Sequence, residues 1–353
     1  MSGPVMSSDG FWQSTTERQI LALENEGTVR WLHLGLGFGI ASICVALMVV
    51  IAPFSPVADI VEKVSDCSEN PSLFSSDQEL SVLNESGIRD GDCLHDLEIA
   101  SWNVKRFGPS GAEDEARVAE MAGKISNYDI VAVQEIKDIQ QTAPYILQDE
   151  IDEISEYGMV LSNRTGAFCE NKSSSQISEQ YAFYYDVKTI KSLDSGNHYP
   201  NNDCEYTREP FAARFVSVEF NHSFVLITLH LDPDDVLNET EALVNVFEWA
   251  KFQYPGEDDF ILLGDLNADC SYARSSELDE LAIRNGDYQW IIPDGTNTNT
   301  AESSSCAYDR MIIGDGGSDE YLGSFSTDCE LEASDHCIIS ARFSSHESSA
   351  VSN

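Results

Sequence analysis

Hydrophobic positions in the C-terminal part of the chain form two kinds of block. Short apolar runs bounded by polar and turn residues are typical of buried strands, and they occupy Leu97–Trp102, Ile130–Val133, Phe215–Phe220, Phe224–Leu229, Phe260–Leu263 and Cys337–Phe343. Longer stretches with apolar residues at helical spacing predict helices over Glu113–Ile125, Thr240–Phe252 and Ser276–Arg284. This mixture predicts an α/β or α+β domain whose cores are sheets.

A different apolar pattern precedes that domain. Leu34 to Pro53 reads LGLGFGIASICVALMVVIAP, 20 residues without a charge, which is long enough to cross ~30 Å of hydrocarbon as a helix. We therefore expect a transmembrane anchor over residues 32–54; the alternative is a secretory signal, whose apolar core is usually only ~7–15 residues long. Arg18 and Arg30 precede the span and Lys63 follows it, a weak bias that predicts a cytoplasmic N-terminus.

The remaining segments follow from this division. Residues 1–31 are a short polar segment predicted to be cytoplasmic, residues 55–96 an acidic Ser-rich stalk, residues 97–344 the compact domain and residues 345–353 a polar tail. The expected location is the cell membrane, crossed once, with the compact domain outside; secretion after signal cleavage is the alternative.

The cysteines and glycosylation sequons fit an outside location. Cys44 lies in the predicted span, and the other eight of the nine cysteines allow four disulfides, with Cys67–Cys93 a candidate loop in the stalk. N-x-S/T sequons occur at Asn84, Asn163, Asn171, Asn221 and Asn238.

Charge narrows the classes of function. The chain has 20 Lys and Arg against 61 Asp and Glu, a formal net charge of −41. Residues 97–345 alone hold 16 basic and 46 acidic residues, a net of −30. Proteins that coat nucleic acid hold phosphates with an excess of Lys and Arg, so this class is disfavoured, whereas an enzyme with brief contact is not excluded.

Several apolar strands end in a polar residue that is costly to bury. LEIASWN ends in Asn103, DIVAVQE in Glu135 and FVLITLH in His230, and ILLGDLN supplies Asp265 and Asn267. Burying a carboxylate or imidazole costs several kcal/mol unless it is paired or binds a metal. A single such residue could be a salt-bridged strand end or a hydrogen-bonded core histidine, but four strand ends from distant parts of the chain predict one shared site.

The residue types at these positions indicate metal-assisted chemistry. Near the C-terminus, AYDR adds Asp309 and Arg310, and SDHC adds Asp335 and His336. Carboxylate and amide oxygens suit Mg²⁺, Mn²⁺ or Ca²⁺, and a histidine beside a carboxylate suits general acid–base catalysis. We therefore expect hydrolysis of a phosphoester by an activated water.

These motifs resemble those of the endonuclease/exonuclease/phosphatase superfamily. The general marks are SWNVKRFG, DIVAVQEIKD, ITLHLDP, GDLNAD and SDH, and the strings GDLNADCSY, TREPFAARF and CAYDRMII resemble its deoxyribonuclease I branch. The resemblance covers about residues 97–344. It implies an α/β fold, a four-layer α/β sandwich of two packed mixed sheets flanked by helices, here preceded by the predicted transmembrane helix.

The resemblance also implies roles for individual residues. One divalent metal, Mg²⁺ or Mn²⁺ and as a further candidate Ca²⁺, would be held by Asn103, Glu135 and Asp335, while Asp265 and Asn267 would serve a second metal or position the phosphate. His230 would pair with Glu179 and His336 with Asp309; one pair activates water and the other protonates the leaving 3′ oxygen, in an order the motifs leave open. Phosphate or DNA contacts would come from Lys105, Lys137, Arg208 and Tyr308, with Asp138 near the first metal ligand.

Three disulfides are expected in the domain. The resemblance implies Cys270–Cys306, and Cys169–Cys204 and Cys329–Cys337 are further candidate pairs.

The chain departs from the family pattern at positions that would touch substrate. Lys137 and Lys105 stand where the family has Arg, Ile177 where it has a Tyr, and Thr298 where a calcium loop begins with Asp. The family has a small disulfide just before the Arg-Glu-Pro motif, which is Arg208 to Pro210 here. This chain lacks it, since only Cys204 lies there.

The expected function is that of a metal-dependent endonuclease that cleaves DNA with little sequence preference and leaves 5′-phosphate and 3′-hydroxyl ends. DNA would bind transiently, and we expect a monomer attached to the membrane by one span. The alternatives are a phosphodiesterase or phosphatase acting on lipid headgroups or small phosphoesters, and a non-catalytic acidic adhesion protein.

Overall fold

A computed structural model describes residues 96–346 apart from 167–177, 287, 302–303, 316 and 318. The predicted N-terminal segment and anchor at 1–54 and nearly all of the stalk lie outside these residues, as does most of the polar tail. Among the described residues, no helix is long and apolar enough to cross a membrane.

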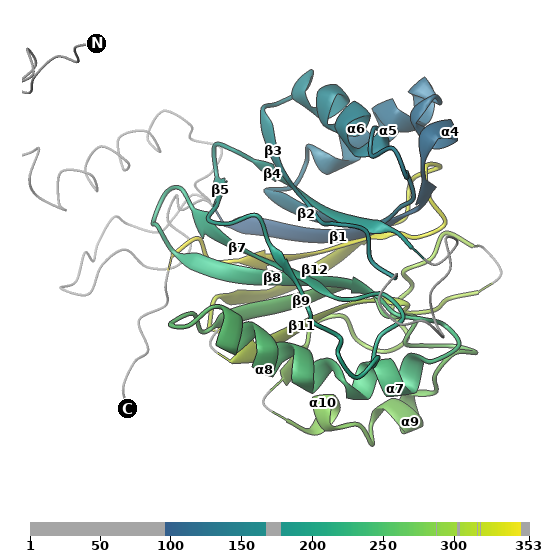
Figure 1. The fold of residues 1–353 in the computed structure, drawn as a ribbon, viewed down its shortest axis with the longest axis vertical. Helices are drawn as coiled ribbons and strands as arrows, with labels where there is room; N and C mark the ends of the chain where they lie inside the picture. Colours follow the sequence, from purple (N-terminus) through teal and green to yellow (C-terminus); the bar gives the residue numbers. More distant parts are fainter. Residues whose placement is uncertain are drawn as a thin grey trace, which may run out of the picture. The chain divides into compact units, whose positions relative to one another are not determined.

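Two mixed sheets form the centre of the domain (Figure 1). The first has the strand order β12-β13-β1-β2-β4-β3, with bounds β1 Leu97–Phe107, β2 Ile130–Ile136, β3 Tyr157–Leu161, β4 Gln180–Asp186, β12 Tyr321–Asp328 and β13 Ile338–Phe343. The second has the order β10-β11-β9-β8-β7-β5, and β6 pairs with β7. Its bounds are β5 Ile190–Ser192, β6 Asn197–His198, β7 Phe211–Ser217, β8 Ser223–His230, β9 Asp259–Asp265, β10 Tyr288–Trp290 and β11 Asp309–Asp315.

Helices cover the outer face of each sheet (Figure 1). The first sheet carries α4 Pro109–Ala112, α5 Glu115–Ile125 and α6 Ala143–Asp152. The second carries α7 Val236–Glu241, α8 Leu243–Gln253, α9 Ser275–Leu278 and α10 Ala282–Asn285. The helix–sheet–sheet–helix order confirms the predicted α/β sandwich.

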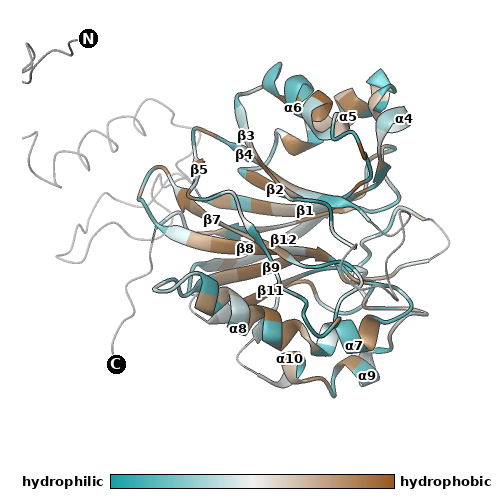
Figure 2. Cartoon of the chain, in the orientation of Figure 1, coloured by the Kyte–Doolittle hydropathy of each residue, from teal (hydrophilic) through white to brown (hydrophobic). Residues whose placement is uncertain are grey.

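Strand alternation explains the three apolar clusters between these layers. In β1, Leu97 and Ile99 belong to the cluster between the sheets, whereas Ala100 and Trp102 pack with Met121 of α5 on the outer side. A third cluster joins the second sheet to α8. The central strands contain many hydrophobic residues (Figure 2), and these belong to clusters on both faces of each sheet, which is why their sequences read as continuous apolar runs.

Most predicted elements have different bounds in the structure. β1 continues past the predicted end at Trp102 to Phe107, so Asn103 lies within the strand. The helix expected over Thr240–Phe252 is α7 and α8, divided at Ala242.

The strand expected over Phe215–Phe220 ends at Ser217, because Asn221 adopts a φ of 57° and its N–H donates to the Ser217 carbonyl in the turn to β8. The helix expected over Ser276–Arg284 is α9 and α10, separated where Leu281 is extended. The break lets both Leu278 and Ile283 enter the cluster beneath α8.

Candidate active site

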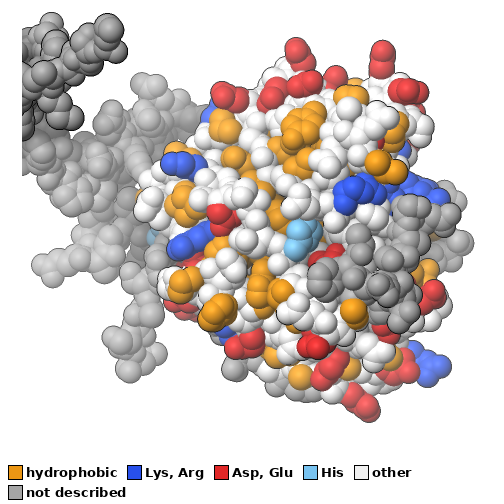
Figure 3. Space-filling view, viewed as in Figure 1, with side chains coloured by type: hydrophobic (Ala, Val, Ile, Leu, Met, Phe, Trp, Pro, Cys, Tyr) orange, Lys and Arg blue, Asp and Glu red, His pale blue; other side chains and the backbone are white. Residues whose placement is uncertain are grey.

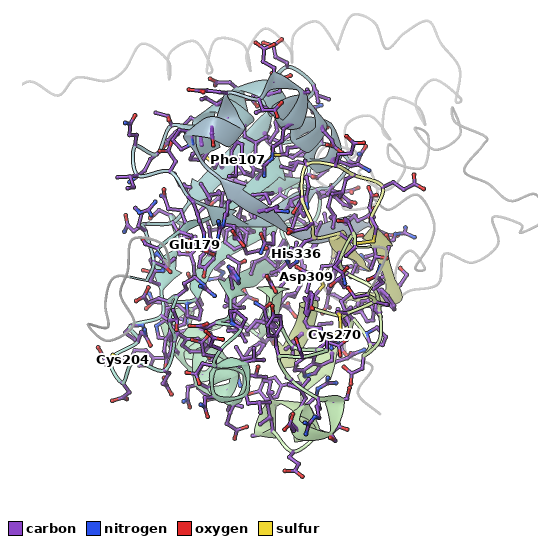
Figure 4. All side chains as sticks on the ribbon, turned by 90° about the vertical axis from the view of Figure 1, so that its right-hand side faces the viewer. Phe107, Glu179, Cys204, Cys270, Asp309 and His336 are labelled. Carbon is purple, nitrogen blue, oxygen red and sulfur yellow. A yellow bond between two sulfur atoms is a disulfide. The ribbon has the colours of Figure 1, made fainter. Side chains whose placement is uncertain are left out.

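Strand register brings the polar strand ends together at one edge of the sandwich. Asp265 at the end of β9 is paired with His230 of the parallel strand β8 and with Asp309 of the antiparallel strand β11. Gly264 permits this approach, since a Cβ there would lie 2.0 Å from the Leu229 carbonyl oxygen. Figure 4 shows Glu179, Asp309 and His336 at this edge.

Asp265 is the centre of the arrangement. Its side chain is only 2% exposed, and its Oδ2 accepts a hydrogen bond of 2.9 Å from Asn103 Nδ2. The same oxygen lies 3.4 Å from Nε2 of His230 and 3.6 Å from Nε2 of His336. Burial raises the pKa of the Asp265 carboxyl, but the two imidazoles and the hydrogen bonds outweigh burial and hold it below its ordinary value.

The first histidine pair is His230 with Glu179. His230 Nδ1 lies 3.1 Å from Oε1 of Glu179, whose side chain is fully buried. Burial raises the pKa of Glu179, and the charges of His230, Arg208 and Lys137 lower it by more. Lys137 Nζ lies 3.7 Å from the Glu179 carboxylate, so cations lie beside Glu179 while the Asp265 carboxylate faces His230.

Arg208 is turned into the protein and holds the main chain of this pair. Its Nε donates to the His230 carbonyl at 2.7 Å and its Nη2 to the Leu231 carbonyl at 2.6 Å. Arg208 is 6% exposed. The structure therefore shows Arg208 positioning His230, and the phosphate contact expected from the sequence stays a prediction.

The second pair is His336 with Asp309. His336 Nδ1 lies 2.9 Å from Asp309 Oδ2. Burial raises the pKa of the Asp309 carboxyl, and the nearby Asp265 carboxylate adds to this against the effect of His336. Burial lowers the pKa of His336, but Asp309 and Asp265 outweigh it and raise that pKa to about 10. Burial is the main cause of the raised pKa of Asp309, whereas neighbouring negative charge raises the pKa of His336.

This second pair fits a divalent cation. Asp265, Asp309 and His336 each offer a ligand atom within 4.8 Å of the others. Asp309 Oδ1 is buried and has no hydrogen-bond partner among the described residues, a costly state for a carboxylate oxygen unless a cation is present. Carboxylate oxygens are also the donors that Mg²⁺ and Mn²⁺ prefer.

The ligand group predicted from the sequence is only partly assembled. Asn103 Nδ2 donates to Glu135 Oε1 at 3.2 Å, so the amide nitrogen of Asn103 faces the carboxylates. Glu135 and Asp335 each contact a lysine, Glu135 at 3.6 Å from Lys137 Nζ and Asp335 at 2.8 Å from Lys105 Nζ. A metal held by Asn103, Glu135 and Asp335 stays a prediction.

Comparison with known proteins agrees with this geometry. Residues 100–336 match the model of the Endonuclease/Exonuclease/phosphatase family. The chain belongs to this family. Mouse deoxyribonuclease-1-like 2 is 33% identical over 226 residues, which cover 62% of this chain and 76% of that protein. Rabbit deoxyribonuclease-1 is 32% identical, covering 62% of this chain and 77% of its own. These relatives place the chain in the deoxyribonuclease I-like branch.

Among solved structures, a humanized D. rerio TDP2 aligns with a TM-score of 0.48 at 15% identity, over 70% of this chain and 98% of that chain.

Other predicted residues of this deoxyribonuclease I-like domain have visible structural contacts. Asn267 lies beside Asp265, since its N–H donates to Asp265 Oδ1 at 3.0 Å and its Nδ2 to the Leu231 carbonyl. The Tyr308 ring lies at the rim, 6.3 Å from the His336 ring. Asp138 is fully buried and accepts N–H donors from Thr142 and Ala143, so it caps α6.

Backbone strain concentrates at the same edge. The non-glycine residues Lys105, Arg106, Glu135 and Asn267 have φ values of 48°, 50°, 64° and 50°. Such conformations cost about 1–3 kcal/mol each and persist only where surrounding contacts hold them. Here the contacts are local, for instance Arg106 N–H to Glu135 Oε2 at 3.0 Å.

Two predicted disulfides are confirmed. Cys270–Cys306 joins the segment after β9 to the segment before β11, and Cys329–Cys337 closes a short loop before β13. Cys204 is disulfide-bonded, but Cys169 lies outside the described residues, so their predicted pairing is untested. Cys67, Cys93 and Ile177 also lie outside.

Sequence reasoning missed three residues that support the site. Glu239 of α7 accepts the N–H groups of Thr207 and Asp232 on either side of the Arg208 contact. The Thr298 hydroxyl accepts the N–H groups of Tyr308 and Asp309. Arg117 donates to the main chain that follows Asn103. A Glu or Arg on a helix carries no signal of such contacts, and Thr298, which stands where the family has the first Asp of a calcium loop, does not indicate them either.

Proposed function

We propose that this protein is a divalent-metal-dependent endonuclease that hydrolyses phosphodiester bonds of DNA with little sequence preference and leaves 5′-phosphate and 3′-hydroxyl ends. One observation carries the proposal. Two histidines, each oriented by a buried carboxylate, approach the same Asp265 oxygen at 3.4 and 3.6 Å. The names of the deoxyribonuclease relatives supply the substrate class.

In the proposed mechanism the two imidazoles divide the proton transfers. Glu179 and Asp309 each face an Nδ1 atom, which leaves both Nε2 atoms directed toward Asp265. One Nε2 takes a proton from the attacking water, and the other gives a proton to the leaving 3′ oxygen. A divalent cation bound by Asp265, Asp309 and neighbouring donors would stabilise negative charge on the phosphoryl oxygens.

The decisive experiment is a plasmid-nicking assay with the full chain, with Mg²⁺ and Mn²⁺ each supplied over a range of salt concentrations. We expect supercoiled plasmid to become open circles that DNA ligase reseals, since ligase needs 5′-phosphate beside 3′-hydroxyl. The matched control is Asp265→Ala, which we expect to be inactive. No cleavage by wild type under any of these conditions would refute the proposal.

A phosphodiesterase or phosphatase acting on small or lipid phosphoesters is the second candidate. Lys137, a predicted DNA contact, is engaged with Glu135 and Glu179 at 3.6 and 3.7 Å, which reduces its availability to a duplex. Release of a phosphomonoester from such diesters, or of phosphate from such monoesters, without plasmid nicking would favour this candidate.

We further propose that the domain works outside the cell, attached by the span predicted at 32–54. The disulfides Cys270–Cys306 and Cys329–Cys337 support an oxidising compartment. Alkaline extraction of membranes tests attachment, because an integral span stays in the pellet. Protease added to intact cells tests which side the domain occupies; a domain that is protected from protease and released by alkali would contradict both parts.

A further inference from the structure

The segment that follows Asn103 is fixed by hydrogen bonds from several directions. Lys105 N–H donates to Asn103 Oδ1 at 2.9 Å, and Arg106 N–H donates to Glu135 Oε2 at 3.0 Å. The Phe107 carbonyl accepts the N–H of Lys137 at 2.7 Å. These bonds hold Lys105 and Arg106 in consecutive left-handed conformations, at φ values of 48° and 50°.

Arg117 of α5 secures the carbonyl side of the same segment. Its Nη2 donates to the carbonyls of Val104 and Lys105, and its Nε to the Ala333 carbonyl at 3.0 Å. Its guanidinium also lies 5.7 Å from the centre of the Phe107 ring. A strained segment held by this many contacts presents its side chains in a fixed direction before any ligand arrives.

The side chain of Arg106 is exposed and uncommitted. Most Lys and Arg side chains of the described residues contact an acid or donate to oxygen atoms of the protein, including Lys105, which bonds Asp335 at 2.8 Å. Within the described part of the chain, only Arg106 and Lys191 have neither kind of contact. Lys191 lies in β5, an edge strand of the second sheet.

The Arg106 side chain lies on a protein surface that is mostly acidic, so its lack of an acidic partner is unusual. Acidic side chains are spread over the upper and lower margins of the face in Figure 3, while Lys and Arg side chains lie in separate groups at its left and at its right. Residues 97–345 hold 46 acidic residues, yet the Arg106 side chain forms no ion pair with any acid of the described residues. Its positive charge is therefore available to an anion.

We infer that Arg106 binds a backbone phosphate of the nucleic-acid strand next to the phosphate that is hydrolysed. Its N–H bonds Glu135, Glu135 bonds Asn103, and Asn103 bonds Asp265, so Arg106 flanks the acid–base centre. A guanidinium matches two phosphate oxygens at once, and no ion pair has to break first. The inference rests on the proposed function and adds a substrate contact that the family motifs did not indicate.

The test compares Arg106→Gln with Lys191→Gln. Lys191→Gln is the control, because it removes a positive charge that also has no acidic partner but lies in β5, at an edge of the second sheet. Both changes are made in the full chain carrying His336→Ala, so that a fluorescent 20-base-pair duplex is bound in Mg²⁺ without rapid cleavage. We expect Arg106→Gln to weaken binding about tenfold at low salt, as for a charged hydrogen bond. The slope of log affinity against log salt should fall by about one, and Lys191→Gln should match its parent.

The same variants with His336 intact separate binding from chemistry. Arg106→Gln should raise KM for plasmid and leave kcat near that of wild type, and Arg106→Lys should restore the salt slope with part of the affinity. Equal effects of Arg106→Gln and Lys191→Gln on binding, or an unchanged salt slope, would overturn the inference about Arg106. Plasmid nicking by the wild-type chain would still support the proposed function in that case. A wild-type chain that neither binds nor cleaves duplex DNA would refute both.

Discussion

The two histidine–carboxylate pairs look alike along the chain but differ in their surroundings. Glu179 and His230 lie among cations, because Lys137 is 3.7 Å from Glu179 and Arg208 bonds the His230 carbonyl. Asp265 faces both pairs, at 3.4 Å from His230 and 3.6 Å from His336. Among the described residues, however, no Lys or Arg forms an ion pair with Asp309, and Asp335 adds negative charge beside His336. The first pair is electrostatically balanced by the protein itself, whereas the second holds unbalanced negative charge.

The difference in surrounding charge predicts different roles for the two histidine–carboxylate pairs, although both contain the same kinds of residue. A balanced pair needs no ligand and can be held rigidly, as the buried Arg208 and Glu239 contacts show. An unbalanced pair with an unpartnered oxygen, Asp309 Oδ1, gains most from a bound cation. We therefore expect metal binding to depend on the second pair and not on the first.

The largest effect is expected from Asp265→Asn, because Asp265 is shared by the two pairs. The change keeps the shape and removes the charge that faces both Nε2 atoms. We expect kcat for plasmid nicking to fall by about 10³-fold or more, within the range for loss of groups that act together. Circular dichroism should show an unchanged fold. Retention of a tenth of the wild-type kcat would show that the pairs work independently.

The next effect separates the pairs directly, through Glu179→Gln and Asp309→Asn. Each removes the carboxylate that orients an imidazole, so kcat should fall by about 10²-fold in both. Only Asp309→Asn should also weaken Mn²⁺ binding, measured by calorimetry, because Asp309 belongs to the group of ligand atoms within 4.8 Å. Equal loss of Mn²⁺ affinity in the two variants would break the comparison.

The sequence predicts the strand ends well and their tertiary supports poorly. Asn103, Glu135, His230 and Asp265 end apolar runs, and strand register alone brings such residues to one edge. The inward turn of Arg208 could not be foreseen, because it depends on carbonyls exposed where β8 ends.

Local pattern also failed where tertiary packing decides the outcome. Asp138 follows the metal motif directly, yet its carboxylate caps α6. Apolar spacing over Ser276–Arg284 suited one helix, but burial of both Leu278 and Ile283 required two.

A smaller effect is expected from the residues that support each pair. Glu239→Gln leaves one acceptor for the two N–H groups of Thr207 and Asp232, and Thr298→Val leaves none for Tyr308 and Asp309. We expect each change to lower kcat by about tenfold with KM little changed, because the misplaced groups act in the chemical step. Thr298→Ser keeps the hydroxyl and should retain most of the wild-type kcat, whereas a purely volumetric role of Thr298 would leave Val close to wild type and impair Ser.

The smallest effect concerns the pH dependence of stability without metal. The pKa of His336 is raised from its ordinary 6.5 to about 10, so its protonation stabilises the folded chain fully below pH 6.5, and this contribution is lost as pH rises toward 10. The lowered pKa of Glu179 has the opposite sign, since its contribution is lost as pH falls into the acidic range. In EDTA, thermal unfolding should therefore show a melting temperature that declines above neutral pH.

His336→Ala should reduce only this decline at alkaline pH, and Glu179→Gln should reduce only the decline at acidic pH. If His336→Ala instead reduced the decline of the melting temperature at acidic pH, the unbalanced negative charge would not lie at the second pair.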